Sequence, residues 1–482
     1  MLLAFQNHQK VTQAQNPKNQ IFKHLPKVEL HVHAEGGTLD QETLKYLAQK
    51  NRLPEPYDLF SPDDNRNLAY NAPDFGHFLS VYDQATSYIQ SPQDVQEVIY
   101  RYLKRCHLEG AVYIELTCSP DHVQKFRKTY LDVQAELAGE LGAKEAAKPS
   151  ASLEESMSYA SFVEAVVAGI NQANEEFGIE ARILMVLLRH NGSEAAMKTL
   201  DDMIAYPHPY VVGINLAGDE EKFPPELFVD CYAKAKEHGL KLTAHVGEHA
   251  GPDKIEEAVI KMKLDRVGHG VTAIQSPGVM QFLKINKTPL ELCPSSNLSL
   301  ELFPSLDEHP LKTFLESGIS FSINSDDPTF FGSSLGQEYA KVQAHWGLSD
   351  AQMLEISTNA IRASFAEETL KDQLLAQVVL YEQFHKLKKL LEPYIKNIIY
   401  QHLLSYEADP TVQLALVLNN GIQEDFEDDE IKFQAQAFMM ANRAFHAAKT
   451  LHKATIGERM VAFAEAGSKT PVSETKKVAL GN

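Results

Sequence analysis

Two histidines stand two residues apart in the segment ELHVH, in which polar residues alternate with the apolar residues Leu30 and Val32. Successive side chains of a β-strand point to opposite faces, so His31 and His33 would share one face while Leu30 and Val32 take the other. Two imidazoles on one strand face can bind a single metal ion, although two exposed histidines on an edge strand would give the same pattern. The pair is therefore a candidate metal site that other residues must complete.

Three further polar clusters stand where other predicted strands end. His245 lies in LTAHVGEHAG, His269 lies between glycines in RVGHGV, and Asp326 and Asp327 lie in SINSDDP. Each cluster alone has an ordinary explanation, either a buried histidine bonded to a carbonyl group or an Asp-Asp-Pro turn. Their shared position at strand ends favours one common metal-binding or catalytic site.

Eight apolar segments of strand length alternate with helical patterns, such as the amphipathic residues 225–239 and 252–263. This order predicts an α/β fold, a (β/α)8 TIM barrel, whose active site lies at the carboxyl ends of its strands. A doubly wound open sheet is the main alternative, but no GxGxxG motif follows the first strand. The predicted strands are residues 28–32, 111–116, 182–188, 210–216, 240–246, 265–269, 289–293 and 319–324.

The chain also differs from a minimal barrel. About 80 residues separate the first two strands, which predicts a helical excursion after strand 1. The low-complexity segment 137–156 is expected to be a surface loop or an extra helix. Beyond residue 370 only helical patterns occur, and their apolar stripes require burial against the same chain or in a homodimer. We expect a flexible N-terminal tail over 1–20, a barrel over 21–370, a C-terminal helical extension over 371–455 and a flexible tail over 456–482.

The overall composition narrows the ligand class and the compartment. The net charge of -20 opposes binding to nucleic acid, whose phosphates require clustered cations, and leaves small molecules as ligands. Four cysteines without a CxxC pair indicate reduced thiols. The N-terminal residues lack a signal-peptide pattern, and no apolar run approaches the length of about 18 residues that a spanning helix needs. We therefore expect a cytoplasmic protein without a membrane partner.

Five motifs, in one order, resemble those of a known family. LPKVELHVHAEGG, INLAGDE, TAHVGEHAGP, RVGHGVTAI and INSDDP are similar to the motif set of the adenosine deaminases, which belong to the metal-dependent amidohydrolase barrels. The resemblance covers roughly residues 22–370 and includes the connecting stretches CPSSNLSL and HPLKTFLESGI. It implies a purine nucleoside as the substrate, with hydrolytic deamination of adenosine or 2'-deoxyadenosine to inosine and ammonia.

The resemblance also implies a zinc site. One Zn²⁺ per chain would supply hydroxide from a bound water at neutral pH. The base and cytidine deaminases that use HxE with PCxxC are excluded, because no PCxxC occurs in the chain. Two-metal relatives usually carry a bridging lysine in the strand region that here reads INLAGDE, so a single metal ion is expected. Its implied ligands are His31, His33, His245 and Asp326.

Further residues match positions that contact the purine in this family. Glu248 would protonate N1, and His269 would orient the water and help to take its proton. Asp327 would hydrogen-bond N7, and the backbone of Gly218 would approach N3. The apolar walls of the purine site would come from the excursion after the first strand, through Phe78, Leu79 and Tyr82.

Glu35 departs from the pattern of typical adenosine deaminases, which carry an aspartate here that contacts the ribose 5'-hydroxyl. A glutamate followed by an extra glycine is reminiscent of the adenine deaminases. Against that reading, the chain has GHG where adenine deaminases tend to carry DHG, and its LAGDE motif is intact. Adenosine is therefore the first expectation, and adenine or a modified adenine nucleoside is the alternative. A deaminase-like binding protein without turnover is a further alternative, which the complete set of site residues opposes.

Overall fold

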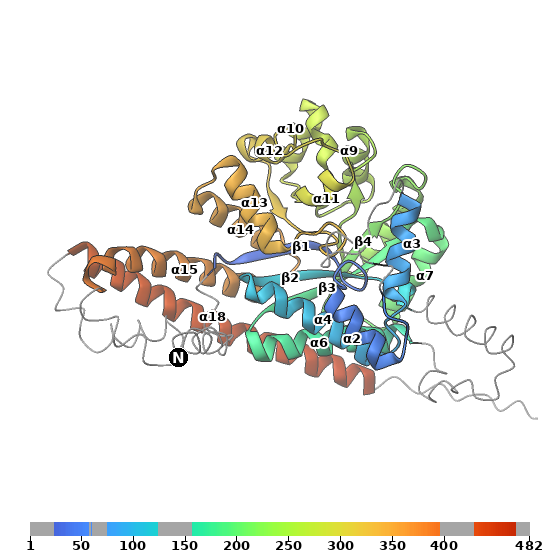
Figure 1. Ribbon diagram of the computed structural model, residues 1–482, viewed down its shortest axis with the longest axis horizontal. Coiled ribbons are helices and arrows are strands. Elements are labelled where there is room, and N and C mark those ends of the chain that lie inside the picture. Colours follow the sequence, from blue (N-terminus) through green and yellow to red (C-terminus); the bar gives the residue numbers. More distant parts are fainter. Residues whose placement is uncertain (1–23, 57–58, 60–74, 124–156, 396–428, 469–482) are drawn as a thin grey trace, which may run out of the picture.

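The computed structural model describes residues 24–56, 59, 75–123, 157–395 and 429–468 (Figure 1). Every strand pair among these residues is parallel and joins strands that are consecutive in the chain. A five-stranded sheet contains β1 (Lys27–His33), β2 (Ala111–Cys118), β3 (Glu180–Leu188), β4 (Val211–Ala217) and β5 (Lys241–Leu242). A four-stranded sheet contains β6 (His245–Val246), β7 (Val267–His269), β8 (Leu290–Leu292) and β9 (Phe321–Ile323).

The two sheets adjoin one another at two places. On one side, β5 and β6 are two pieces of the single strand expected over 240–246. Between these two pieces, the backbone carbonyl of Thr243 accepts a hydrogen bond from the Tyr232 hydroxyl at 2.6 Å. On the other side, Val32 of β1 forms a parallel bridge with Asp326, just after β9. The parallel α/β fold predicted from the sequence is thus confirmed, with one strand interrupted.

Helices connect the strands and cover them on both sides. In Figure 1 the later helices, α9 to α14, lie above the strands, whereas α4 and α6 lie below them. The described residues of the predicted excursion after the first strand include the helices α2 (Gln41–Asn51), α3 (Phe75–Thr86) and α4 (Pro92–Leu108). The other helices are α6 (Tyr159–Phe177), α7 (Gly192–Ala205), α8 (Val229–Glu237), α9 (Pro252–Lys261), α10 (Pro277–Asn286), α11 (Pro294–Ser299), α12 (Leu311–Ser317), α13 (Leu335–Trp346), α14 (Asp350–Ala363), α15 (Glu368–Ile395) and α18 (Asp429–Ser468), with 3-10 turns η4 (Arg189–Asn191), η5 (Pro225–Phe228) and η6 (Val271–Gln275).

Local sequence explains where many of these helices begin. The side chain of Ser91 accepts a hydrogen bond from Asp94 N at the start of α4, and Pro92 takes the first helical position. Helices α13 and α14 both begin with a capping box, formed by a serine and the glutamine three residues later. The strands are instead recognised as runs of apolar residues, because almost all of their side chains are buried. Strand β2, for example, is buried along its whole length.

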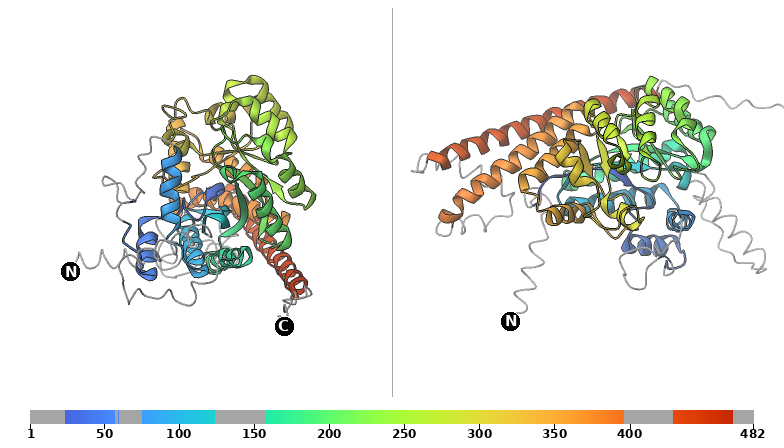
Figure 2. Two further views of the ribbon diagram at one scale, coloured as in Figure 1. Left: turned by 90° about the vertical axis from the view of Figure 1, so that its right-hand side faces the viewer. Right: turned by 90° about the horizontal axis from the view of Figure 1, so that it is seen from above.

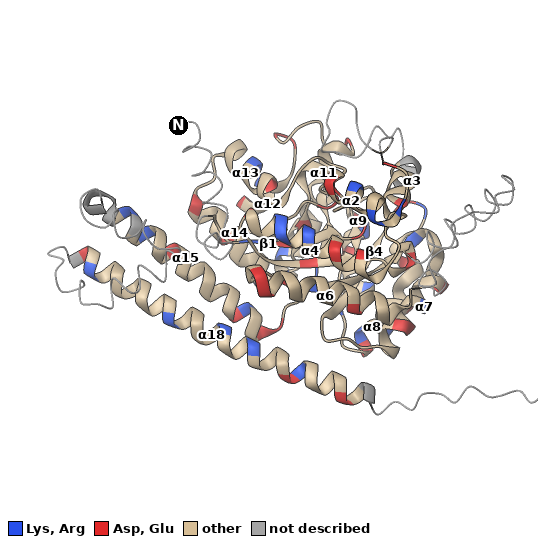
Figure 3. Cartoon of the chain, turned by 60° about the horizontal axis from the view of Figure 1, so that its bottom comes forward, with Lys and Arg blue, Asp and Glu red and all other residues tan. Residues whose placement is uncertain are grey.

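The C-terminal helices α15 and α18 lie side by side (Figures 1 and 2). Their apolar stripes pack on each other through a separate cluster that includes Leu380, Leu387 and Phe438. Glu367, just before α15, is bound by Arg182 of β3 and by Arg459 of α18, which ties the helix pair to the sheet. Charged residues of both signs are spread over the two helices rather than gathered at one end (Figure 3). Burial against the same chain therefore accounts for part of the predicted stripes.

Helix α18 ends at Ser468, whereas residues from 456 onward were expected to belong to a flexible tail. The alanines in MVAFAEAG favour a continued helix. The expected tail over 1–20, the segment 137–156 and residues beyond 468 lie outside the described residues. No helix in the described ranges has the length and apolar character needed to cross a membrane.

Candidate active site

A cavity of about 610 Å³ opens at the carboxyl ends of the strands. Its walls include the last residues of β1, β3, β4 and β7, which is the end of a parallel α/β fold where ligands bind. His31 is fully buried and lies next to this lining. Leu79 belongs to α3, and its side chain lies outside the described part of the structure. The predicted residues that line the cavity are His33, Glu35, Phe78, Tyr82, Gly218, His245, Glu248, His269, Asp326 and Asp327.

The four expected metal ligands converge on one point. Ligand atoms of His31, His33, His245 and Asp326 all lie within 4.8 Å of one another. His245 Nε2 is 3.0 Å from His31 Nε2 and 3.2 Å from His33 Nε2. Burial lowers the pKa of His33 to about 4, so this ring is neutral and its nitrogen lone pair is available. Three imidazoles and one carboxylate are a ligand set that suits a borderline-soft ion such as Zn²⁺.

Two of these imidazoles are oriented by a partner on the other ring nitrogen. Glu291 Oε2 lies 2.7 Å from His31 Nδ1, and Asn215 Oδ1 lies 3.2 Å from His245 Nδ1. An oxygen acceptor at this distance holds the proton on Nδ1. The Nε2 atoms of both rings then keep their lone pairs for a metal ion.

Asp326 keeps one carboxylate oxygen for a further ligand. Its Oδ2 accepts a hydrogen bond from Ser296 Oγ at 2.7 Å. Its Oδ1 is buried and makes no hydrogen bond within the described residues, although His31 Nε2 lies 3.2 Å away. Burial opposes a charge on His31, but Asp326 and Glu291 outweigh it and raise the pKa of this imidazole to about 10. The cluster thus stabilises a positive charge at this point, which a metal cation would supply.

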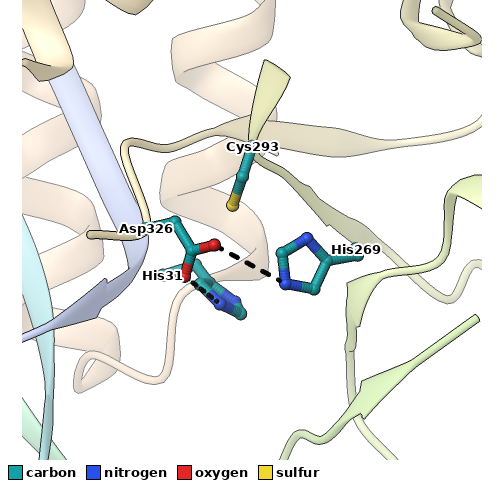
Figure 4. A group of neighbouring side chains, drawn as sticks. All are labelled: His31, His269, Cys293 and Asp326. Carbon is teal, nitrogen blue, oxygen red and sulfur yellow. Dashed lines mark ion pairs between the residues drawn. The ribbon is translucent and has the colours of Figure 1, made fainter. Parts of the chain in front are cut away.

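A second group of potential ligands overlaps the first. His31, His269, Cys293 and Asp326 also lie within 4.8 Å of one another (Figure 4). Burial, together with the nearby Asp326 carboxylate, raises the pKa of the Cys293 thiol well above its usual value. Because the thiolate is the form that binds metals, Cys293 is a poor ligand here. The first group is the better candidate for a metal centre.

His269 and Asp326 both have left-handed backbone conformations, with φ of 57° and 63°. Such a conformation costs a non-glycine residue on the order of 1 kcal/mol and persists only where the surroundings impose it. At Asp326 the surroundings are strand β1: His33 N donates to Asp326 O at 3.0 Å, and Asp326 N donates to His31 O at 3.2 Å. The same contacts that continue the sheet therefore place this carboxylate beside the two histidines.

Glu248 follows β6 in a turn that Glu220 of the LAGDE motif holds in place. The Glu220 carboxylate accepts hydrogen bonds of 2.7 to 3.2 Å from four successive backbone N–H groups, those of Gly247, Glu248, His249 and Ala250. Burial raises the pKa of Glu248 well above its usual value, and the Asp326 and Glu220 carboxylates add to this effect. A carboxyl group that stays protonated in a cavity can act as a general acid.

Two further carboxyl groups, Asp327 and Glu35, are buried in the cavity wall. Burial raises the pKa of both groups, and the neighbouring Asp326 adds to the effect at Asp327. Glu35 Oε1 accepts a hydrogen bond from Ser119 N at 2.7 Å. Glu35 Oε2 and Asp327 Oδ1 have no hydrogen-bond partner among the described residues. Buried polar atoms of this kind are positions where a ligand can complete the hydrogen bonding.

Aromatic rings from α3 and from the loop after β9 pack beside these carboxyl groups. The Phe78 ring stacks on Phe331 with centroids 6.2 Å apart, and the Tyr82 ring stacks on Phe330 at 5.8 Å. Tyr82 also lies against Gly36, where an added Cβ would be only 2.2 Å from the ring. The glycine after Glu35 thus permits the close approach of the ring to the turn.

Behind the metal-ligand cluster lies a fully buried network of charges. Arg266 donates to Glu115 Oε2 at 2.5 Å and to Glu291 Oε1 at 2.7 Å, and its guanidinium lies over the ring of Phe365. Burial opposes ionisation of Glu291, but Arg266 and His31 outweigh it and lower the pKa of this carboxyl to about 2. Arg266 thereby keeps Glu291 ionised and ready to orient His31.

Replacement of Arg266 with methionine should destabilise the protein by about 3–5 kcal/mol, because two buried carboxylates lose their partner. Urea unfolding would measure the loss, with Arg362→Met as the control, since Arg362 is an exposed arginine of α14. A loss below about 1 kcal/mol, the size of a surface ion pair, would show that the network is not a stabilising element.

The sequence patterns assign no role to several residues that support the site. Glu220 and Asn215 lie in the quoted motif INLAGDE, and Ser296 lies in the quoted stretch CPSSNLSL, but no local pattern indicated what they contact. Glu291 is an exception, because a charged residue in an apolar strand indicates a buried partner. Such residues are almost never buried unless they are paired.

Comparison with known proteins identifies relatives over most of the chain. An adenine deaminase from Psychrobacter cryohalolentis is 30% identical over 358 residues, which are 74% of this chain and 98% of that protein. The crystal structure of adenine deaminase from Arthrobacter aurescens aligns with a TM-score of 0.60 and 28% identity, covering 73% of this chain and 98% of that one. The N6-methyl-AMP deaminase of Arabidopsis thaliana aligns with a TM-score of 0.59 and 25% identity, covering 74% and 97% of the two chains.

The profile described as adenosine deaminase matches residues 26–381, which is more than half of the chain. This range contains four of the five motifs in full, the first motif from Pro26 onward, and every residue of the cavity described above. The resemblance seen in the motifs is confirmed, and the chain belongs to the adenosine deaminase family.

Proposed function

We propose that this chain is a zinc-dependent hydrolase that removes the 6-amino group of adenine and releases hypoxanthine and ammonia. One observation carries the deaminase proposal: three imidazoles and a carboxylate converge beside a cavity that also holds a buried carboxyl group, Glu248, whose pKa is raised. A metal centre next to a protonated acid is the arrangement that hydrolysis of an aminopurine requires.

Adenine as the substrate is supported by the relatives and by Glu35. The two adenine deaminases described above match over 98% of their own lengths. Glutamate followed by two glycines is the feature of this sequence that is reminiscent of adenine deaminases. The GHG sequence and the intact LAGDE motif favour adenosine as the first expectation from the sequence alone. The relatives favour the alternative, and we propose adenine in its place.

We also infer that the strands close into a (β/α)8 barrel. Eight strand segments follow in chain order, one of them in two pieces, and the bridge between Val32 and Asp326 brings the last next to the first. The structural alignment with an amidohydrolase deaminase supports this reading.

The residues of the cavity can divide the work of the reaction. The three histidines and Asp326 would hold Zn²⁺, which would lower the pKa of a water molecule and so supply hydroxide near pH 7. Addition of the oxygen at C6 moves electron density to N1, where Glu248 delivers its proton. The C6–N6 bond then breaks as the proton of the added hydroxyl group passes to the departing nitrogen, which leaves as ammonia. His269 orients the attacking oxygen. Burial raises the pKa of Asp327 and so favours its protonated form, which can donate to N7.

Glu35 is placed to recognise the free base. Its Oε2 has no hydrogen-bond partner among the described residues, and the N9–H of adenine is a donor that a nucleoside lacks. The backbone of Gly218, which takes a φ of 111°, lines the same cavity and can approach N3. The long side chain of Glu35 therefore selects a purine with hydrogen, rather than ribose, on N9.

Glu35→Asp should lower kcat/KM for adenine by about tenfold or more, because the shorter side chain withdraws its acceptor from N9–H. The value for adenosine should fall less or rise, so that the ratio of adenine to adenosine drops. Rates of ammonia release from adenine, adenosine and AMP, in the parent and in the variant, give this ratio. An adenosine preference of tenfold or more in the parent would overturn the choice of adenine while leaving the deaminase proposal intact.

Adenosine is the second candidate. The cavity of about 610 Å³ lies well within the size range of sites for ligands larger than a single purine base. The same panel of substrates decides between the two, and N6-methyl-AMP extends it to the substrate named for the Arabidopsis relative.

A further inference from the structure

His269 is connected to the protein interior by a chain of three buried hydrogen bonds. Leu311 N donates to His309 Nδ1 at 3.2 Å. His309 Nε2 lies 3.2 Å from Asn297 Oδ1, and Asn297 Nδ2 lies 3.3 Å from His269 Nδ1. Asn297 and His269 are 0% exposed and His309 is 3% exposed, so water cannot replace these partners. Asn297 lies in CPSSNLSL and His309 begins HPLKTFLESGI, two stretches to which the site described so far gives no catalytic task.

The direction of each hydrogen bond in this chain follows from its first member. A backbone N–H can only donate, so His309 Nδ1 must be an acceptor. Burial lowers the pKa of His309 to about 4, so the ring is neutral and carries its single proton on Nε2. The Asn297 atom that faces this proton must be the carbonyl oxygen, which directs the amide N–H group to His269. With the amide turned round, two donors would face each other between Asn297 and His309.

We propose that Asn297 and His309 are positioning residues, which hold neutral His269 in the tautomer with its proton on Nε2. This inference rests on the proposed function, in which His269 orients the attacking oxygen. His269 Nδ1 accepts a hydrogen bond from Asn297, so the N–H group of the His269 ring points away from this chain of hydrogen bonds. His269 Nε2 lies 3.6 Å from Glu248 Oε1 and 3.9 Å from Asp326 Oδ2, on the side of the site where Figure 4 shows the dashed contact to Asp326.

The tautomer defines what His269 does in the resting enzyme. An Nε2–H group donates a hydrogen bond to an oxygen placed between the ring and Asp326. It has no lone pair on that side with which to accept a proton. The family resemblance implied that this histidine orients the water and helps to take its proton; the hydrogen-bond chain supports the first role and opposes the second.

Three substitutions test the chain of hydrogen bonds. Asn297→Asp keeps the size of the side chain but presents only acceptors, so it should draw a proton onto His269 Nδ1. His309→Gln keeps a donor toward Asn297, whereas His309→Leu removes it. Asn286→Asp is the matched control, because Asn286 is exposed and caps α10 through a hydrogen bond to Phe282 O.

Two measurements on the zinc-loaded, full-length protein separate positioning from packing. Nitrogen-15 NMR of histidine-labelled protein reports which ring nitrogen of His269 is protonated, and comparison with His269→Gln identifies its signal. Steady-state kinetics report kcat and KM. In the parent we expect an acceptor-type Nδ1 and a protonated Nε2. In Asn297→Asp we expect a protonated Nδ1 and a fall in kcat of about 10²-fold with little change in KM or in bound zinc.

The pair of variants at His309 keeps the inference testable if Asn297→Asp fails to fold. His309→Leu should lower kcat by about tenfold, the factor that corresponds to one lost hydrogen bond, while His309→Gln retains most of the activity. A protonated Nδ1 in the parent, or equal activities of His309→Gln and His309→Leu, would overturn the proposal. If the parent deaminates none of the purines offered, the proposed function fails on that result alone, and the NMR signals still decide the tautomer.

Discussion

Replacement of Glu248 with glutamine should lower kcat for deamination by about 10²–10⁴-fold, the usual contribution of a general acid. The amide has the size of the carboxyl group and can hydrogen-bond N1, but it cannot deliver a proton there. The turn that carries it should remain, because Glu220 binds the backbone of this turn and not the Glu248 side chain. Bound zinc and the affinity for a purine product should therefore stay close to those of the parent.

The pH dependence gives this prediction a second readout. Burial raises the pKa of Glu248, so its protonated form persists to higher pH than that of an ordinary glutamate. The rate supplied by this acid is present below the raised pKa and is lost as the pH rises through it. The parent should show this decline on the alkaline side, and Glu248→Gln should lack it.

Metal analysis, product binding and kcat across pH would be measured for Glu248→Gln and for Glu355→Gln. Glu355 is an exposed glutamate of α14 and serves as the control for loss of one carboxyl group. Turnover of Glu248→Gln within about tenfold of the parent would be too small a loss for a general acid, and would assign the protonation of N1 to another group.

Replacement of His245 with alanine should remove bound zinc and activity together. His245 Nε2 lies within 3.2 Å of both His31 Nε2 and His33 Nε2, so it supplies the third imidazole of the ligand set. Two histidines and Asp326 would hold the ion less well and leave its geometry undefined. We expect about one zinc per chain in the parent and little in the variant.

Asn215→Ala offers a graded comparison, because Asn215 only orients His245 through Nδ1. Loss of such a partner typically weakens metal affinity by about 10–100-fold, so this variant should recover activity when zinc is added. Two equivalents of metal in active parent protein, or full activity in His245→Ala without metal, would contradict the single-metal site.

Periodicity within single segments, together with the resemblance of the five motifs to a known family, accounts for what could be predicted about the site. His31 and His33 share a face because strand side chains alternate, and His245, His269 and Asp326 stand at or just after strand ends. The parallel α/β class followed from the same alternation of strands and helices. The interruption between β5 and β6 could not be predicted, because residues 240–246 have the pattern of one strand; at this point the Thr243 carbonyl accepts a hydrogen bond from Tyr232 of the distant helix α8.

The supporting residues depend on contacts between segments that are far apart in the chain. Glu220 cradles the turn after β6 from 27 to 30 positions away, and Asn297 reaches His269 across 28. No local pattern encodes such pairings. The charged residues in the otherwise apolar segments AVYIELTC and LEL were a usable signal, since Glu115 and Glu291 prove to be partners of Arg266.

The central claim is that the zinc-loaded protein hydrolyses the 6-amino group of adenine. Incubation with adenine in ¹⁸O-labelled water, followed by mass spectrometry of the purine and an assay of ammonia, tests it most directly. We predict hypoxanthine that carries the label at C6, with ammonia released in equal amount, and no conversion after the zinc is removed by a chelator. Unchanged adenine under conditions in which the protein holds its zinc would contradict the account.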